Sequence, residues 1–308
     1  MRIDVHAHFL PESLEEQIRN RGGAAGPAAN MRDSLSDLGI RLADMTERGI
    51  DIELISPAPW TINSDPANVT LVNNEIAKAI APHSDRLIGL AGVSMQEPEQ
   101  AARELERCVK DLGFRGCEIL TNVHSENLHE RKFAPFYKKL AELDVPAFVH
   151  PANVLGADRL APFFLNNLIG NPTDTAVAAA SLIFGGVLAE LPTLKFVLAH
   201  GGGTCPLLRG RWEHAWKLSL VEDSVITRPP SEYFRRLYFD TLTHSAPYLS
   251  ALVEQVGADR VMLGSDYPFG MGDFTPPYSV AGLPHTSEGD KALIESANAI
   301  RVFGLDLG

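Results

Sequence analysis

Cysteine, clustered positive charge and long apolar runs are all scarce in this chain of 308 residues. Its three cysteines are scattered and odd in number, which argues against a disulfide framework and against a cysteine-based zinc site. The formal net charge is −12 and the chain has no run of Lys or Arg, so the positive surface that binds nucleic acid is not expected. No stretch approaches the roughly 18 apolar residues of a membrane span, and the first residues lack the basic and apolar zones of a secretory signal. These absences predict a cytoplasmic protein with neither a nucleic acid nor a membrane as its partner.

Short apolar runs alternate with longer segments of helical spacing along the whole chain. Eight runs are strand candidates, at residues 3–5, 50–55, 86–93, 113–120, 145–149, 195–198, 237–239 and 260–263. Seven segments between them repeat apolar residues every three or four positions, at 38–48, 67–81, 98–112, 133–143, 173–191, 247–256 and 288–303. Strands apolar enough to be covered on both faces, alternating with helices, are typical of a parallel sheet. Eight such units predict an α/β fold of the (β/α)8 TIM-barrel type, with a doubly wound sheet as the alternative.

Three segments interrupt this alternation, at 19–30, 152–171 and 268–285. Each follows a strand candidate and is longer than a typical loop between strand and helix. In a barrel such loops lie at the carboxyl ends of the strands, where active sites are built. No repeat, low-complexity tail or linker divides the sequence, so we expect a single domain over residues 1–308.

Histidine and aspartate stand at the ends of several strand candidates. The first strand lies in MRIDVHAHFL, which contains His6 and His8. The motif FVHP places His150 after the fifth strand, VLAHGGG places His200 after the sixth, and LGSDYPF places Asp266 after the eighth. Side chains two positions apart on a strand point to the same side, so the first two histidines can reach one ion.

These residue types at these places predict a metal site. Imidazole nitrogen and carboxylate oxygen suit zinc and similar divalent ions, and a catalytic site keeps one position open for water. His6, His8, His150 and Asp266 would supply such a set, with His200 near the metal but not necessarily bound to it. Such an ion lowers the pKa of bound water to about 7, and a nearby histidine can take or return the proton. A lone histidine at a strand end is usually a satisfied polar residue, but five such residues in one predicted barrel favour the metal.

The same motifs carry a family resemblance. IDVHAH, FVHP, LIFGGV, LAHGGG and VMLGSDYPF make the chain similar to the amidohydrolase superfamily, in its 2-amino-3-carboxymuconate 6-semialdehyde decarboxylase-like branch. The resemblance implies an amidohydrolase-type barrel with zinc on His6, His8, His150 and Asp266, and with His200 as the acid/base. The lysine that bridges two metals in some members has no match, because the fourth strand ends in GCEIL. One divalent ion is therefore expected, zinc, with manganese as the other candidate.

The resemblance also bears on the substrate and on assembly. Arg211 lies eleven residues beyond His200, where the family uses an arginine that reaches a neighbouring subunit's site; it implies an acidic substrate and a homodimer, since arginine pairs with a carboxylate through two hydrogen bonds. Arg32 is the nearest candidate for a second substrate arginine. Glu118 stands where the branch usually carries Gln, and it either contacts metal or substrate or is simply a hydrogen-bonded carboxylate at a strand end. The Trp-Asp that follows the His-Pro pair in these decarboxylases is absent after His150-Pro151, which leaves the exact substrate open.

We therefore expect a metal-dependent enzyme, a carboxy-lyase of aromatic compound catabolism. It would remove CO2 without an oxidant from a small unsaturated or aromatic carboxylic acid, namely 2-amino-3-carboxymuconate 6-semialdehyde or a close analogue. The alternative is a metal-dependent hydrolase or hydratase of a lactone, amide or unsaturated acid on the same fold. A ligand-binding barrel with a vestigial site is a third hypothesis, but no ligand and no acid/base candidate has been lost from the motifs.

Overall fold

The computed structural model describes residues 1–12, 14, 29–274, 280, 283 and 286–307. Each of the eight predicted strand runs contains strand structure, although the run at 86–93 is split in two. The strands of the main sheet are β1 (Ile3–Phe9), β2 (Ile52–Pro57), β3 (Leu87–Gly89), β4 (Ala91–Gly92), β5 (Cys117–Leu120), β8 (Ala147–His150), β9 (Phe196–Leu198), β10 (Tyr238–Asp240) and β11 (Val261–Met262). A small antiparallel hairpin, β6 (Asn122–Val123) and β7 (Glu126–Asn127), follows β5.

The strands are parallel and follow one another in chain order around a barrel. β1, β2 and β3 pair in turn, and β4, β5, β8, β9, β10 and β11 pair in turn. The chain changes partner at Leu90, whose N–H donates to Ile55 while the next N–H, of Ala91, donates to Gly116. The last strand returns to the first through a hydrogen bond from the Val5 N–H to the Leu263 carbonyl, 2.9 Å, and a parallel bridge between Ala7 and Tyr267. The (β/α)8 barrel prediction is confirmed, and the doubly wound alternative is wrong.

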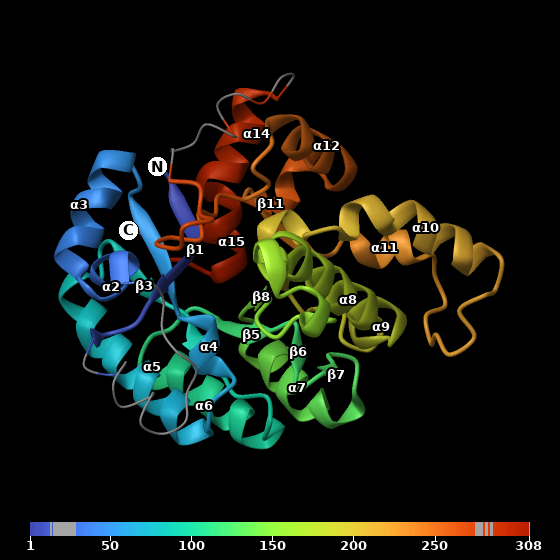
Figure 1. The fold of residues 1–308 in the computed structure, drawn as a ribbon, viewed down its shortest axis with the longest axis horizontal. Coiled ribbons are helices and arrows are strands. Elements are labelled where there is room, and N and C mark those ends of the chain that lie inside the picture. The colour runs from blue at the N-terminus through green and yellow to red at the C-terminus, as the bar shows by residue number, and fades with distance from the viewer. Residues whose placement is uncertain (13, 15–28, 275–279, 281–282, 284–285, 308) are drawn as a thin grey trace.

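Helices surround the strands in Figure 1. All seven predicted helical segments are present, as α3 (Leu38–Arg48), α5 (Pro66–Ile80), α6 (Pro98–Asp111), α7 (Ala134–Leu143), α8 (Asn171–Phe184) with α9 (Val187–Glu190), α12 (Ala246–Val256), and α14 (Glu288–Ala292) with α15 (Asn298–Phe303). The predicted segment 173–191 breaks into two helices because Gly186 adopts a left-handed conformation, φ 82°. Among the described residues, four further α-helices were not predicted: α2 (Ala29–Ser36), α4 (Pro59–Ile62), α10 (Cys205–Lys217) and α11 (Pro230–Phe234).

The barrel interior is filled from one end by apolar side chains and left polar at the other. The apolar layer is built from strand residues and from α15, and includes Ile3, Val5, Ile52, Leu54, Leu90, Phe148, Val197, Met262, Val302 and Phe303. Along β1 the pairing register with β2 shifts between Asp4 and Ala7, so both Val5 and His6 face the interior. This bulge ends the apolar filling and begins the polar end of the barrel.

Two of the three predicted long loops are only partly described. The segment 152–170 is described and consists of short turns, including a π-helical turn at Asn166–Gly170 that leads into α8. Most of 19–30 and part of 268–285 lie outside the described residues. Among the helices that are described, none is long and apolar enough to cross a membrane.

Candidate metal centre and active site

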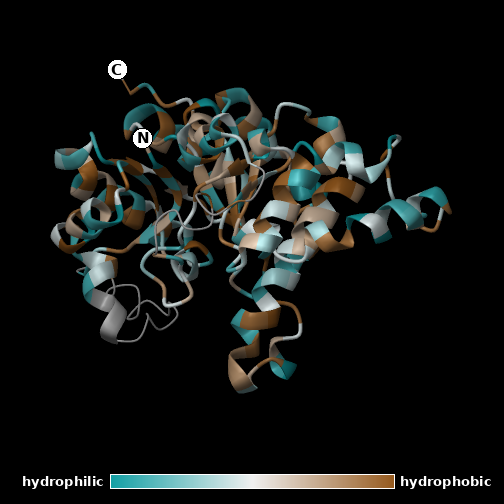
Figure 2. Ribbon diagram, turned by 90° about the horizontal axis from the view of Figure 1, so that it is seen from above, coloured by the Kyte–Doolittle hydropathy of each residue, from teal (hydrophilic) through white to brown (hydrophobic). Residues whose placement is uncertain are grey.

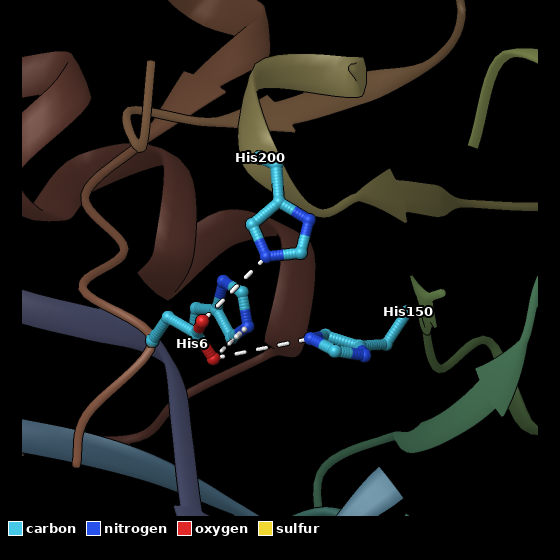
Figure 3. Close-up of side chains that lie close together, drawn as sticks. His6, His150 and His200 are labelled. Carbon is cyan, nitrogen blue, oxygen red and sulfur yellow. Dashed lines mark ion pairs between the residues drawn. The ribbon is translucent and has the colours of Figure 1, made fainter. Parts of the chain in front are cut away.

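Five side chains meet at the carboxyl ends of the strands. His6 and His8 come from β1, His150 ends β8, His200 follows β9, and Asp266 follows β11. The Nε2 atoms of His6 and His8 lie 3.2 and 3.1 Å from the same oxygen of Asp266, Oδ1. The Nε2 of His150 lies 3.9 Å from that oxygen, and the Nε2 of His200 lies 3.6 Å from the other one, Oδ2. Figure 3 shows the His6, His150 and His200 rings converging.

The polar atoms that face this centre lack hydrogen bonds. Among the described residues, buried atoms without a partner include Nε2 of His6, His8 and His150 and Oδ1 of Asp266. Each such orphaned group costs roughly 1–3 kcal/mol when nothing else satisfies it. Three imidazole nitrogens and a carboxylate oxygen are the donor set that zinc, and also manganese, accepts. The residues therefore fit a divalent cation.

The opposite nitrogens of two histidines fix which ring atom faces the centre. His6 Nδ1 lies 2.7 Å from Asp240 Oδ2, and His8 Nδ1 lies 3.2 Å from the carbonyl oxygen of Pro57 and 3.0 Å from Ser56 Oγ, whose own hydrogen is donated to the Ala7 carbonyl. A carbonyl or a carboxylate accepts a hydrogen bond, so Nδ1 carries the proton in both rings. The Nε2 lone pairs are then free for a metal, as in carboxylate–histidine–metal arrangements.

Burial and the carboxylate set the charges of the metal-free chain. Burial alone would lower the pKa of His6, but the charge of Asp266 and the bond to Asp240 raise it to about 10. Burial lowers the pKa of His8, and it lowers that of His150 still further. Burial would raise the pKa of Asp266, but the His6 charge outweighs this and holds it well below its usual value. In the metal-free chain the centre therefore offers the neutral imidazoles of His8 and His150 and the ionised carboxylate of Asp266, and a cation would displace the proton that His6 holds.

His200 differs from the other four in its exposure. One atom each of His6, His150, His200 and Asp266 lie within 4.8 Å of one another, a group that contains His200 and leaves out His8. The His200 side chain is 17% exposed, whereas those of His6 and His8 are fully buried. Geometry alone therefore allows His200 to be a ligand, and its open edge allows it to meet a substrate.

A cavity of about 230 Å³ opens beside His200. It lies between the start of α8, the HGGG turn and the loop after β10, and its lining includes Asn167, Asn171, Thr243, His244 and Tyr248. These side chains donate or accept hydrogen bonds without carrying a fixed charge. Three larger hollows, of about 740, 670 and 420 Å³, lie elsewhere on the described part of the molecule, and none of the five converging residues lines them.

The predicted substrate residues are placed very differently. Glu118 lies on β5, fully buried, with Oε2 3.5 Å from His8 Nδ1 and with no hydrogen-bond partner for either oxygen among the described residues; burial raises its pKa to about 8. Arg211 is exposed on α10 and does not line the cavity beside His200. Arg32 lies in α2, and its side chain lies outside the described part of the chain.

Asp240, which ends β10, was missed by the sequence reasoning. Its Oδ2 accepts from His6 Nδ1 and from the His200 N–H, 2.9 Å, and its Oδ1 accepts from the N–H groups of Gly201, 2.6 Å, and Leu242, 3.1 Å. It is fully buried. The signal was present, since Asp240 directly follows the predicted strand 237–239, as the other site residues follow or end theirs.

Comparison with known proteins finds relatives that match nearly the whole chain. The chain matches the family described as Amidohydrolase over residues 3–305. It is 31% identical to the 2-amino-3-carboxymuconate-6-semialdehyde decarboxylase of Dictyostelium discoideum, over 99% of this chain and 92% of that protein. It is 32% identical to a gamma-resorcylate decarboxylase of a Polaromonas species, over 97% of this chain and 94% of that protein.

Two further similarities concern the metal and the reaction. The crystal structure of a dihydroxybenzoic acid decarboxylase from Polaromonas, with bound manganese and the inhibitor 2-nitroresorcinol, superposes with a TM-score of 0.83 at 27% identity, covering 99% of this chain and 97% of that one. The chain is also 30% identical to the 2-keto-4-carboxy-3-hexenedioate hydratase of a Sphingobium species, over 86% of this chain and 83% of that protein. Decarboxylases and a hydratase thus both share this barrel.

Proposed function

The chain belongs to the amidohydrolase family, and from this premise we propose that it is a metal-dependent decarboxylase of a small unsaturated or aromatic carboxylic acid. The observation that carries the proposal is the convergence of four histidines and one aspartate, among which Nε2 of His6, His8 and His150 and Oδ1 of Asp266 lack hydrogen-bond partners in the described part of the chain. The decarboxylases among the curated relatives supply the reaction.

His6, His8, His150 and Asp266 would hold one divalent ion. This choice over the set that contains His200 is supported by the Nδ1 bonds of His6 and His8, which leave both Nε2 lone pairs directed at Asp266. The family's structures include manganese; we propose zinc for this chain because three imidazoles and one carboxylate are a common zinc set, with manganese as the other candidate. When bound, such an ion polarises the substrate and stabilises the negative charge that develops on it.

His200 would be the acid/base. The His200 side chain lines the cavity, where a substrate can reach it. The His200 backbone N–H donates to Asp240, which fixes the position from which the ring extends. We assign to it the proton that is delivered to the carbon bearing the carboxylate. The C–C bond then breaks, CO2 leaves, and the new C–H bond takes its place. The conjugated substrate can accept electrons itself, so no organic cofactor is required.

The substrate that we propose is 2-amino-3-carboxymuconate 6-semialdehyde or a close analogue. The Dictyostelium relative supports it, and the neutral hydrogen-bonding side chains around the cavity suit the polar substituents of such acids. Arg211 and Arg32 remain our candidates for a second carboxylate of the substrate, and Glu118 for a contact near His8.

We further propose that the enzyme is a cytoplasmic homodimer built from one domain per chain. Exposed apolar side chains support the dimer: Phe163 is 85% and Phe164 58% exposed in the segment after β8, and Leu207 is 68% exposed on α10. Figure 2 shows both regions projecting from the barrel. A partner on α10 would bring Arg211 towards a neighbouring site. The cytoplasm is supported by three buried cysteines, none of them in a disulfide.

A hydrolase or hydratase is the second candidate. The Sphingobium hydratase supports it, because it shares the barrel at an identity close to that of the decarboxylases. The same metal and His200 would then add water to a double bond, or to a lactone or amide, without loss of carbon.

Product analysis tests the proposal. Protein loaded with Zn²⁺ or Mn²⁺ is incubated separately with freshly generated 2-amino-3-carboxymuconate 6-semialdehyde, with 2,6-dihydroxybenzoate and with 2-keto-4-carboxy-3-hexenedioate, and the products are weighed by mass spectrometry. We expect loss of CO2 that requires the metal and His200 but survives His83→Ala, since His83 ends a 3-10 turn before β3, at the opposite end of the barrel. If the protein adds water to the hexenedioate and leaves the semialdehyde and the 2,6-dihydroxybenzoate unchanged, the hydratase is the correct function and the decarboxylase is refuted.

A further inference from the structure

A buried cluster of two arginines lies behind the metal centre on the side of α3. Arg41 and Arg48 lie seven positions apart on the helix, on the face that is turned towards the strands. Arg41 is fully buried and Arg48 is 8% exposed. Burying two guanidinium groups is costly unless other groups compensate the charge. Their partners therefore indicate what the pair is for.

One carboxylate joins the two arginines. Glu53 on β2 accepts from Arg41 Nη1 through Oε2, 2.7 Å, and from Arg48 Nη2 through Oε1, 2.8 Å. The two guanidinium groups thus share a single carboxylate as their hydrogen-bonded charge partner. The face of the Tyr267 ring lies against both guanidinium groups, whose central carbons are 4.7 Å (Arg41) and 4.3 Å (Arg48) from the ring centroid.

The cluster contacts the backbone of the predicted ligand His8 and the side chain of Tyr267, which follows the predicted ligand Asp266. Arg41 Nη2 donates to the carbonyl oxygen of His8, and the His8 N–H donates to the carbonyl of Tyr267, 2.7 Å. The hydroxyl of Tyr267 donates to Asp44 on the same helix, 2.5 Å, which ties the ring to α3. Tyr267 directly follows Asp266. Side chains of α3 therefore bind both the His8 backbone, through Arg41, and Tyr267, through Asp44.

Asp266 needs such support. Its φ is +60°, a conformation that a residue with a side chain rarely adopts without being held there. Its N–H donates to the His6 carbonyl, 2.8 Å, on the side of β1. On the other side the next residue is clamped between the two guanidinium groups and Asp44. The positions of Asp266 and His8 relative to each other thus depend on groups that touch neither metal nor substrate.

We propose that Arg41, with Glu53, Arg48 and Tyr267, is a positioning element that sets the spacing between His8 and Asp266 and so sets the affinity and geometry of the metal site. This inference rests on the proposed metal site and adds a residue to it that nothing in the motifs assigns. Arg41 is the central member, because it alone binds Glu53, the His8 carbonyl and the Tyr267 ring.

Arg41→Lys tests the role. An ammonium group keeps the charge but cannot reproduce the planar fork that reaches two acceptors. The metal-stripped protein is titrated with Zn²⁺ against a chromophoric chelator, and the Co²⁺-loaded protein is examined by visible absorption, well below the melting temperature. We expect the Zn²⁺ dissociation constant to rise about 10–100-fold, the range for outer partners of ligands, and the Co²⁺ bands to shift.

The matched control is Arg107→Lys. Arg107 on α6 also binds one carboxylate with two nitrogens, at 3.0 and 2.8 Å to Glu104, but touches no predicted ligand. It should leave both readouts unchanged. Folded Arg41→Lys protein with wild-type Zn²⁺ affinity and Co²⁺ bands would overturn the proposal, even if its melting temperature fell.

If Arg41→Lys does not fold, Tyr267→Leu decides, because it removes the ring between the guanidinium groups. Weaker Zn²⁺ binding with shifted Co²⁺ bands supports the positioning role, and wild-type values overturn it. Absence of metal binding by the wild-type chain would instead refute the proposed function and the positioning role with it. The two failures are therefore distinguishable.

Discussion

Among single residues, Asp240 connects the proposed metal ligand His6 to the proposed acid/base His200. One carboxylate holds the His6 ring through Nδ1 and the start of the HGGG turn through the N–H groups of His200 and Gly201. Its burial makes each of these bonds stronger than it would be in water. A change at this one residue should therefore reach both halves of the site.

Asp240→Asn should weaken metal binding. An amide keeps the size of the side chain but not its charge, so the His6 ring loses the partner that fixes its tautomer. We expect the Zn²⁺ dissociation constant to rise roughly 10–100-fold, the usual range for such a partner, in chelator competition. Asp259→Asn, at an exposed position in the turn before β11, is the control. Equal affinities in the two variants would show that Asp240 does not orient His6.

His200→Ala separates the two assignments of the site. If His200 is the acid/base, metal content measured by elemental analysis stays at the wild-type level, while turnover falls by at least about 100-fold. Loss of the metal together with turnover would make His200 a ligand in place of His8. Turnover that persists would remove His200 from the chemistry altogether.

The HGGG turn is the element that carries His200 into the site. His200, Gly201, Gly202 and Gly203 all have positive φ, a run that glycine tolerates and other residues adopt only under strain. At Gly203 an added Cβ would lie 2.2 Å from the backbone oxygen of Pro172 at the start of α8. The turn therefore packs directly on the helix that borders the cavity.

Gly203→Ala should destabilise the chain and displace His200. The backbone conformation alone costs roughly 1–3 kcal/mol, and the clash with Pro172 adds to it. Gly210→Ala on α10 is the control, since nothing lies within 4 Å of its added Cβ and alanine favours a helix over glycine by roughly 0.5–1 kcal/mol. We expect thermal melting to move in opposite directions in the two variants. A Gly203→Ala chain as stable and active as the wild type would show that the turn does not fix His200.

The sequence predicted elements well where the pattern was local. Apolar runs located the barrel strands of the described residues but not the hairpin of β6 and β7, and Leu38–Arg48 was predicted to the residue. Helix α10 was missed although Leu208, Trp212 and Trp216 recur every four positions, because Gly210 and three charged residues interrupt them. The arginine cluster could not be predicted, because its partners come from α3, β2 and the loop after β11, and helical spacing at 41, 45 and 48 gives no hint of buried charge.

Five residues of the candidate site were predicted from the sequence, whereas Asp240 was missed. His8, His150, His200 and Asp266 lie close to or beyond the carboxyl ends of their strands, and His6 lies two residues before His8; a parallel barrel brings such ends together. The strand-end pattern alone did not separate a ligand from an acid/base, because the exposure of the His8 and His200 rings depends on the folded surroundings of each. Asp240 shared the strand-end position but no motif marked it.

For the molecule as a whole, large apolar side chains are exposed to solvent in the segment that follows β8. Leu155, Phe163 and Phe164 are 66%, 85% and 58% exposed, and they lie in the segment that leads into the cavity-lining turn before α8. Burying such side chains against a second chain is worth about 1.5–3 kcal/mol each when complete. Assembly and substrate binding are therefore expected to be coupled through this segment.

Mixing two variants that we expect to be inactive tests whether the proposed dimer completes the site. Arg211→Ala lacks the proposed donor and His150→Ala lacks a proposed ligand, so a hybrid dimer has one intact site. We expect activity to return on mixing and to follow the fraction of hybrid found by native mass spectrometry. Hybrids that form without recovering activity would confine Arg211 to its own chain or remove it from the site.

The most direct test of the central claim is the mass of the product formed in D2O by the metal-loaded enzyme from 2-amino-3-carboxymuconate 6-semialdehyde. We predict a product lighter by one CO2, with one solvent deuterium on the carbon that bore the carboxylate, and no such product after metal removal. A product that keeps both carboxylates and gains water would contradict this prediction.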